Sequence, residues 1–96
     1  MKIAVAQGMS FEEFVLTELQ EIADVDILIL KYGIIPSVSF SAEMTGETRI
    51  FSELCLLSKN LNCALMAVCD TDLYGARHKS AAIVNAGELV DVIDLD

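Results

Sequence analysis

Apolar residues fall along the chain in short unbroken runs and in longer runs with helical spacing. The central short run is Asp-Ile-Leu-Ile-Leu at residues 26–30, followed by Lys31, Tyr32 and Gly33. Four branched aliphatic residues in succession are typical of a strand buried on both faces. Open α/β sheets place their chemistry just beyond the carboxyl ends of such strands, which makes Lys31 and Tyr32 candidate site residues.

A first strand and an amphipathic helix precede this run. Residues 3–7 are apolar apart from the last and are followed by Gly8, which predicts an interior strand. Ser10 and Glu13 have the spacing of a capping box. The helix itself is predicted by apolar residues at helical spacing: Phe11, Phe14, Val15, Leu19, Ile22 and Ala23. Together with the central run, these elements predict a right-handed, parallel β-α-β unit.

The next part of the chain has no regular apolar pattern at first, and the helical spacing then returns. Residues 34–46 contain the only proline and show no clear period, so they are expected to form a loop with a short strand at residues 38–40. A second helix is expected from about residue 47 to about residue 59, because its apolar residues recur at helical spacing: Ile50, Phe51, Leu54 and Leu57.

The remaining pattern predicts strands joined by tight turns. Residues 64–69 form a third apolar run, residues 70–75 have the polar and glycine residues of a hairpin loop, and residues 79–84 are expected to return antiparallel. Residues 85–87 are expected to make a three-residue turn with a left-handed glycine. The last strand, at residues 88–96, carries aspartates that protect an exposed edge. The fold class is therefore α/β, with a mixed sheet of five or six strands and two helices on one face.

Residues 1–96 are expected to form a single domain, and their composition limits the classes of partner that the domain can bind. The net charge of −9 argues against nucleic acid as a partner, because its phosphates require a cationic surface. No apolar stretch is long enough to span a membrane and no secretory signal is visible, so we expect a cytoplasmic protein. Cys55, Cys63 and Cys69 form an odd set without a Cys-x-x-Cys pair, which predicts free, buried thiols.

Four segments carry a family resemblance. They are Lys-Ile-Ala-Val-Ala-Gln at residues 2–7, the central run at 26–30, a helix and strand at residues 52–60 and 64–68, and a hairpin with Tyr74 and residues 79–83 and 87–90. In this order and spacing they resemble the amino-terminal half of the carbon-nitrogen hydrolase (nitrilase) superfamily. The resemblance implies one half of an α-β-β-α sandwich and covers nearly the whole chain.

Members of that family act on nitriles and amides with a Glu-Lys-Cys triad, in which cysteine attacks and glutamate acts as base. The resemblance places the glutamate after the second strand, where this chain has Lys31 and Tyr32. It places the lysine at Leu95 and the cysteine beyond Asp96. All three catalytic side chains are therefore absent, and no catalytic residue is assigned.

The candidate remnant pocket consists of Lys31, Tyr32, Cys69 and Asp70. Cys69 could be a nucleophile, but the carboxylate beside it raises the pKa of a thiol and favours a packing role. Asp70 and Asp72 could hold a divalent cation, although Asp-x-Asp is common in turns. Lys31 could be a buried amine, but solvated lysines are more common. We expect Tyr32 to fill the former acid site, and we expect no metal and no cofactor.

The expected function follows from a chain that forms only half of the sandwich. With two helices on one side, the other sheet face has no cover, and 54% of the residues are hydrophobic. Contiguous apolar surface of this kind is untypical of soluble monomers. We expect a homodimer packed sheet to sheet, or packing on another protein. The favoured function is non-catalytic, through assembly, partner binding or small-ligand binding. The alternative is a subunit or fragment of a carbon-nitrogen hydrolase whose active site is completed by another chain.

Overall fold

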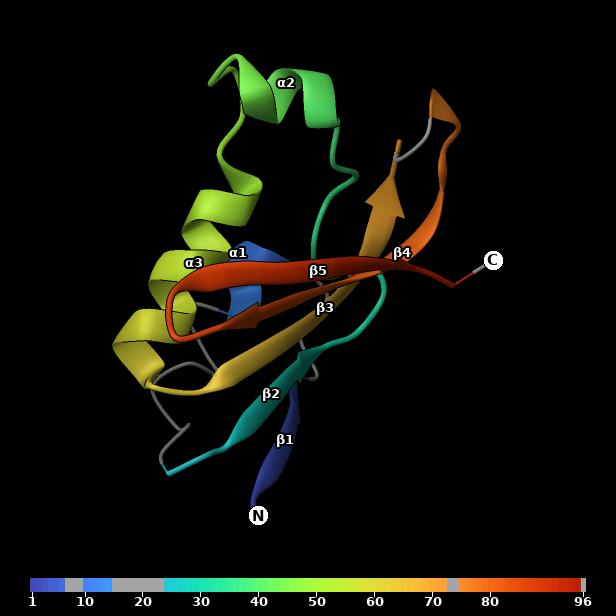
Figure 1. Ribbon diagram of the computed structural model, residues 1–96. Coiled ribbons are helices and arrows are strands. Elements are labelled where there is room, and N and C mark those ends of the chain that lie inside the picture. Colours follow the sequence, from blue (N-terminus) through green and yellow to red (C-terminus); the bar gives the residue numbers. More distant parts are fainter. Residues whose placement is uncertain (7–9, 15–23, 73–74, 96) are drawn as a thin grey trace.

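The computed structural model describes residues 1–6, 10–14, 24–72 and 75–95. One mixed sheet runs through these residues in the order β1-β2-β3-β4-β5 (Figure 1). The pairs β1–β2 and β2–β3 are parallel, and the pairs β3–β4 and β4–β5 are antiparallel. The strands are β1 (Ile3–Ala6), β2 (Ile27–Leu30), β3 (Ala64–Thr71), β4 (His78–Asn85) and β5 (Glu88–Asp94). The predicted α/β class and mixed sheet are confirmed.

One face of the sheet is covered by helices. The long helix α3 (Ile50–Leu61) packs against β3, β4 and β5, and the short α1 (Phe11–Glu13) lies on the same face (Figure 1). Every second side chain of the strands points toward these helices, because successive residues of a strand point to opposite faces of the sheet. The largest fully buried apolar side chains of this core are Phe14, Leu28, Leu30, Leu54 and Leu65.

Strand β2, predicted to be the central strand, is the second of five in the sheet, beside the edge strand β1, and it is buried on one face only. Leu28 and Leu30 are completely buried, whereas Ile27 and Ile29 are partly exposed. The prediction of burial on both faces was therefore wrong for the described part of the chain. An unbroken apolar run is compatible with burial of both faces of a strand, but it does not show that both faces are covered.

Residues 34–46 are more ordered than predicted. Val38 makes an isolated parallel bridge to Thr71, and its N–H donates to the carbonyl of Asp70 over 2.8 Å. Phe40 does not continue this extended segment but begins α2 (Phe40–Met44), because Ser39 caps the helix by accepting from the N–H of Ala42. The short strand at 38–40 is thus a single bridge, and a short helix at residues 40–44 interrupts the predicted loop.

The β4–β5 turn is tighter than predicted. Asn85 pairs with Glu88, so the loop has two residues, Ala86 and Gly87, rather than three. Both have a positive φ, 52° and 81°, which is the conformation of a type I′ turn. This turn is favoured because its twist matches that of the flanking strands.

Two predictions fall on residues that the structure does not describe. Most of the predicted first helix occupies residues 15–23, and Tyr74 belongs to the connection between β3 and β4. Among the described helices, none has the length and apolar character required to cross a bilayer.

Candidate functional site

Tyr32 and Asp70 are brought together by the parallel pairing of β2 and β3. Tyr32 follows β2, and its hydroxyl donates to the Asp70 carboxylate over 2.6 Å. Lys79 pairs with Asp70 across β3 and β4, and its Nζ lies 4.6 Å from the centroid of the Tyr32 ring. The tyrosine ring is 50% exposed. These three residues, which we call the polar cluster, lie on the sheet face away from α3.

Cys69 does not join the polar cluster. It alternates with Asp70 along β3 and is completely buried in the core on the opposite face. Burial raises the pKa of the Cys69 thiol to about 11, and the charge of Asp70 adds to this shift. Lys31 is exposed to solvent. The structure therefore unites Tyr32 and Asp70 but separates Cys69 from them.

The carboxylates at the end of β3 are engaged in hydrogen bonds within the chain. Asp72 accepts from the backbone N–H of Phe40 over 2.8 Å, at the start of α2, and Asp70 accepts from Tyr32. Within the described ranges, His, Cys, Asp and Glu side chains do not form a group of three or more that could hold a metal ion. These two aspartates hold the segment after β2 against the end of β3.

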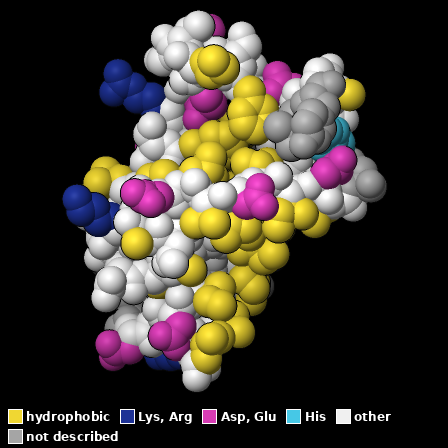
Figure 2. Space-filling view, in the orientation of Figure 1, with side chains coloured by type: hydrophobic (Ala, Val, Ile, Leu, Met, Phe, Trp, Pro, Cys, Tyr) yellow, Lys and Arg dark blue, Asp and Glu magenta, His cyan; other side chains and the backbone are white. Residues whose placement is uncertain are grey.

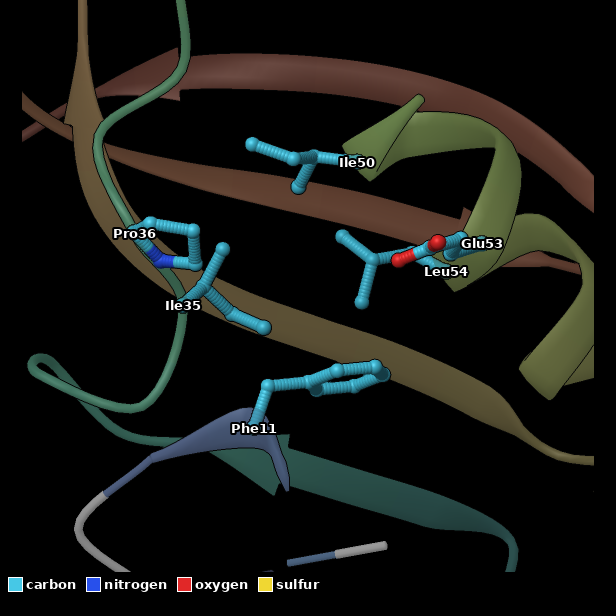
Figure 3. Close-up of a pocket in the computed structure, with 6 residues that line it drawn as sticks. All are labelled: Phe11, Ile35, Pro36, Ile50, Glu53 and Leu54. Carbon is cyan, nitrogen blue, oxygen red and sulfur yellow. The ribbon is translucent and has the colours of Figure 1, made fainter. Parts of the chain in front are cut away.

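A small pocket on the helix side was not predicted from the sequence. It has a volume of about 130 Å³ and lies between α1, the segment after β2 and α3 (Figure 3). Its described lining residues are Phe11, Ile35, Pro36, Ile50, Glu53 and Leu54. These residues come from three separate parts of the chain, so no local spacing could have indicated the pocket.

The sheet face away from α3 is apolar and has no described helix over it. Three of its side chains are strongly exposed: Ile3 is 55% exposed, Val5 46% and Ile93 44%. The register joins them through partly exposed neighbours into continuous rows across the sheet: Ile27, Ile29, Met66, Val68 and Ile83. We call this the uncovered face. Figure 2 shows hydrophobic side chains gathered beside β1 and β2, on the side away from α3.

Comparison of the chain with protein-family models, with curated proteins and with solved structures found no match.

Proposed function

We propose that the chain functions by self-association, with two copies packing their uncovered faces together. The observation that carries this proposal is the set of exposed aliphatic side chains on β1 and β5, which continue a partly buried apolar layer across the sheet. Two sheets that pack face to face lie about 10 Å apart and bury their inward-facing apolar side chains between them. The dimer would then have helices outside and two sheets inside.

The dimensions of the face set the expected strength. The five strands lie about 4.8 Å apart and average about six residues, each with a rise of about 3.3 Å, which gives the face a projected area of about 500 Å². A standard interface buries about 800 Å² of accessible surface on each partner. The uncovered face is smaller than a standard interface, so we expect a weak dimer with a dissociation constant in the micromolar range.

Charge favours the uncovered face over other surfaces of this acidic chain. Two copies with a net charge of −9 repel each other, and contacts must therefore avoid carboxylates. The register places Ile, Val, Met and Ala over most of the face, with Asp91 on β5 and the Asp70–Lys79 pair toward its margins. The apolar centre can pack on a second copy without bringing carboxylates together there.

Sedimentation velocity over a concentration series, up to about 300 µM, tests the proposal. We expect a monomer–dimer equilibrium that Val5→Glu shifts strongly toward monomer. Leu56→Glu is the matched control, because Leu56 is 59% exposed on α3, outside the uncovered face. A monomer at every concentration, or equal effects of the two substitutions, would overturn the proposal.

We also propose that the chain is a non-catalytic relative of the carbon-nitrogen hydrolases. Tyr32 stands where the resemblance places the catalytic glutamate, and its hydroxyl is bonded to Asp70. Burial and a raised pKa keep Cys69 protonated, which is unsuitable for a nucleophile. We expect no hydrolysis of aliphatic amides or nitriles by the purified chain. Turnover that disappears in Cys69→Ala, with the fold retained, would contradict this proposal.

A reducing cytoplasm is the compartment that we propose. All three cysteines are free thiols, and Cys55 is partly exposed on α3. Free thiols persist in reducing compartments and are oxidised or paired elsewhere. Cell fractionation with an antibody against the chain tests this proposal, and recovery outside the cytoplasmic fraction would contradict it.

A further inference from the structure

We propose that the pocket between α1 and α3 binds a small primary amine that carries an apolar group. Five of its six described lining residues are apolar, and the sixth is Glu53. Figure 3 shows the Glu53 carboxylate directed toward the space that Ile35, Pro36 and Ile50 border. The pocket thus offers an apolar interior and one negative charge.

The volume limits the size of the apolar group. An engineered apolar cavity of about 150 Å³ holds benzene, and the present pocket measures about 130 Å³. One phenyl ring or a branched chain of about five carbons therefore fits. Phe11, Ile35 and Leu54 would contact it, and water bound in the same space would find few hydrogen-bond partners among them.

The charge of the pocket selects a cation over an anion. None of the described lining residues is basic. The first amides of α3 could attract an anion, but those of Ile50 and Phe51 already donate to the Glu43 carboxylate. A ligand ammonium group would instead pair with Glu53, which is exposed and lets the ammonium keep part of its hydration.

This proposal is independent of self-association. Ile35 and Leu54 belong to the core between the sheet and the helices, on the opposite side from the uncovered face. Binding of an amine and formation of a dimer can therefore succeed or fail separately, and each has its own substitutions.

Titration of the ¹⁵N-labelled chain with benzylammonium at neutral pH, followed by amide chemical shifts, tests the site. Benzyl alcohol and benzoate serve as neutral and anionic probes of nearly the same shape. We expect shift changes centred on the segment 35–36 and on residues 50–54, with benzylammonium binding about three- to tenfold more tightly than benzyl alcohol and benzoate binding least.

Two variants locate the charge. Glu53→Gln keeps the shape and should weaken benzylammonium binding to the level of benzyl alcohol, about three- to tenfold. Glu47→Gln removes an exposed carboxylate outside the pocket and should leave the affinity unchanged. Unfolding curves of both variants establish that they are folded. No binding at millimolar benzylammonium, equal binding of the alcohol, shift changes centred elsewhere, or equal effects of the two variants would each overturn the proposal.

Discussion

The Glu43 carboxylate accepts a hydrogen bond of 2.8 Å from the backbone N–H of Phe51, which joins the end of α2 to the start of α3. The same carboxylate accepts from the N–H of Ile50 over 3.1 Å and from the Thr48 hydroxyl. Arg49, at the N-cap position of α3, makes no side-chain capping bond. The first N–H groups of a helix need acceptors, and a negative charge there also complements the helix dipole. Glu43 therefore acts as a cap supplied by a neighbouring helix.

We predict that Glu43→Gln destabilises the fold by about 1 kcal/mol, because it removes the charge and leaves one amide oxygen to accept from several donors. The free energy of unfolding in urea measures this effect. Glu47→Gln is the control, since Glu47 is an exposed carboxylate in the same connection. Equal stabilities of the two variants would show that the cap contributes nothing measurable.

The cap should also make stability depend on pH. Burial raises the pKa of Glu43, but the hydrogen bonds from Thr48, Phe51 and Ile50 lower it by more, and the net pKa lies below its ordinary value. A carboxyl whose pKa is lower in the folded state stabilises the fold above its unfolded pKa, and this contribution is lost as the pH falls through the folded pKa. The stability difference between the wild type and Glu43→Gln should therefore shrink between about pH 7 and about pH 3. A constant difference over this range would contradict the assignment.

The three thiols should react in an order set by their burial. Cys55 is partly exposed, Cys63 is 6% exposed and Cys69 is completely buried. Burial raises the pKa of all three, and for Cys69 it reaches about 11. At pH 8 only about one Cys69 thiol in a thousand would be ionised even with free access to solvent. In the folded chain, iodoacetamide should modify Cys55 first and Cys69 last, as measured by peptide mass spectrometry. In urea, all three cysteines should react at similar rates. Preferential labelling of Cys69 in the folded chain would contradict this order and would make Cys69 a candidate nucleophile.

The strands could be predicted from local pattern because a short apolar run, and the alternation of its side chains between two faces, are properties of a few consecutive residues. The approach of Tyr32 to Asp70 also followed from sequence, since each lies at the carboxyl end of one of two adjacent parallel strands. The same alternation shows that Cys69 and Asp70 cannot share a face, so Cys69 could have been removed from the candidate site without a structure.

Features that depend on packing between distant segments were not predictable in this way. Helix α2 is only five residues long, and its role appears only when Glu43 meets the amides of α3. The pocket needs Phe11, Pro36 and Glu53 to converge from three separate segments. The periodicity of one segment does not predict such contacts, because they depend on how whole helices and strands are arranged.

The β4–β5 turn offers a stabilising substitution. Ala86 has a φ of 52°, which disfavours residues with a Cβ, and glycine reaches this conformation without steric cost. Ala86→Gly should stabilise the fold by about 0.5–1 kcal/mol in urea unfolding. Gly87→Ala should destabilise it, because the added Cβ would lie 3.3 Å from the Lys59 Cβ at a φ of 81°. Ala76→Gly, at an exposed position without a positive φ, is the control and should be neutral or slightly destabilising. Destabilisation by Ala86→Gly would contradict the turn geometry.

The Tyr32–Asp70 bond should appear as a coupling in a double-mutant cycle. Asp70→Asn alone also disturbs the charge facing Lys79, so single substitutions do not isolate the bond. Tyr32→Phe removes the hydroxyl and keeps the ring beside Lys79. Because Tyr32 is 50% exposed, we expect a coupling of about 0.5–1 kcal/mol from the urea unfolding of the wild type, both single variants and the double variant. Additive effects would mean that the hydroxyl prefers water to Asp70, and that the register of β2 and β3 rather than this bond positions the polar cluster.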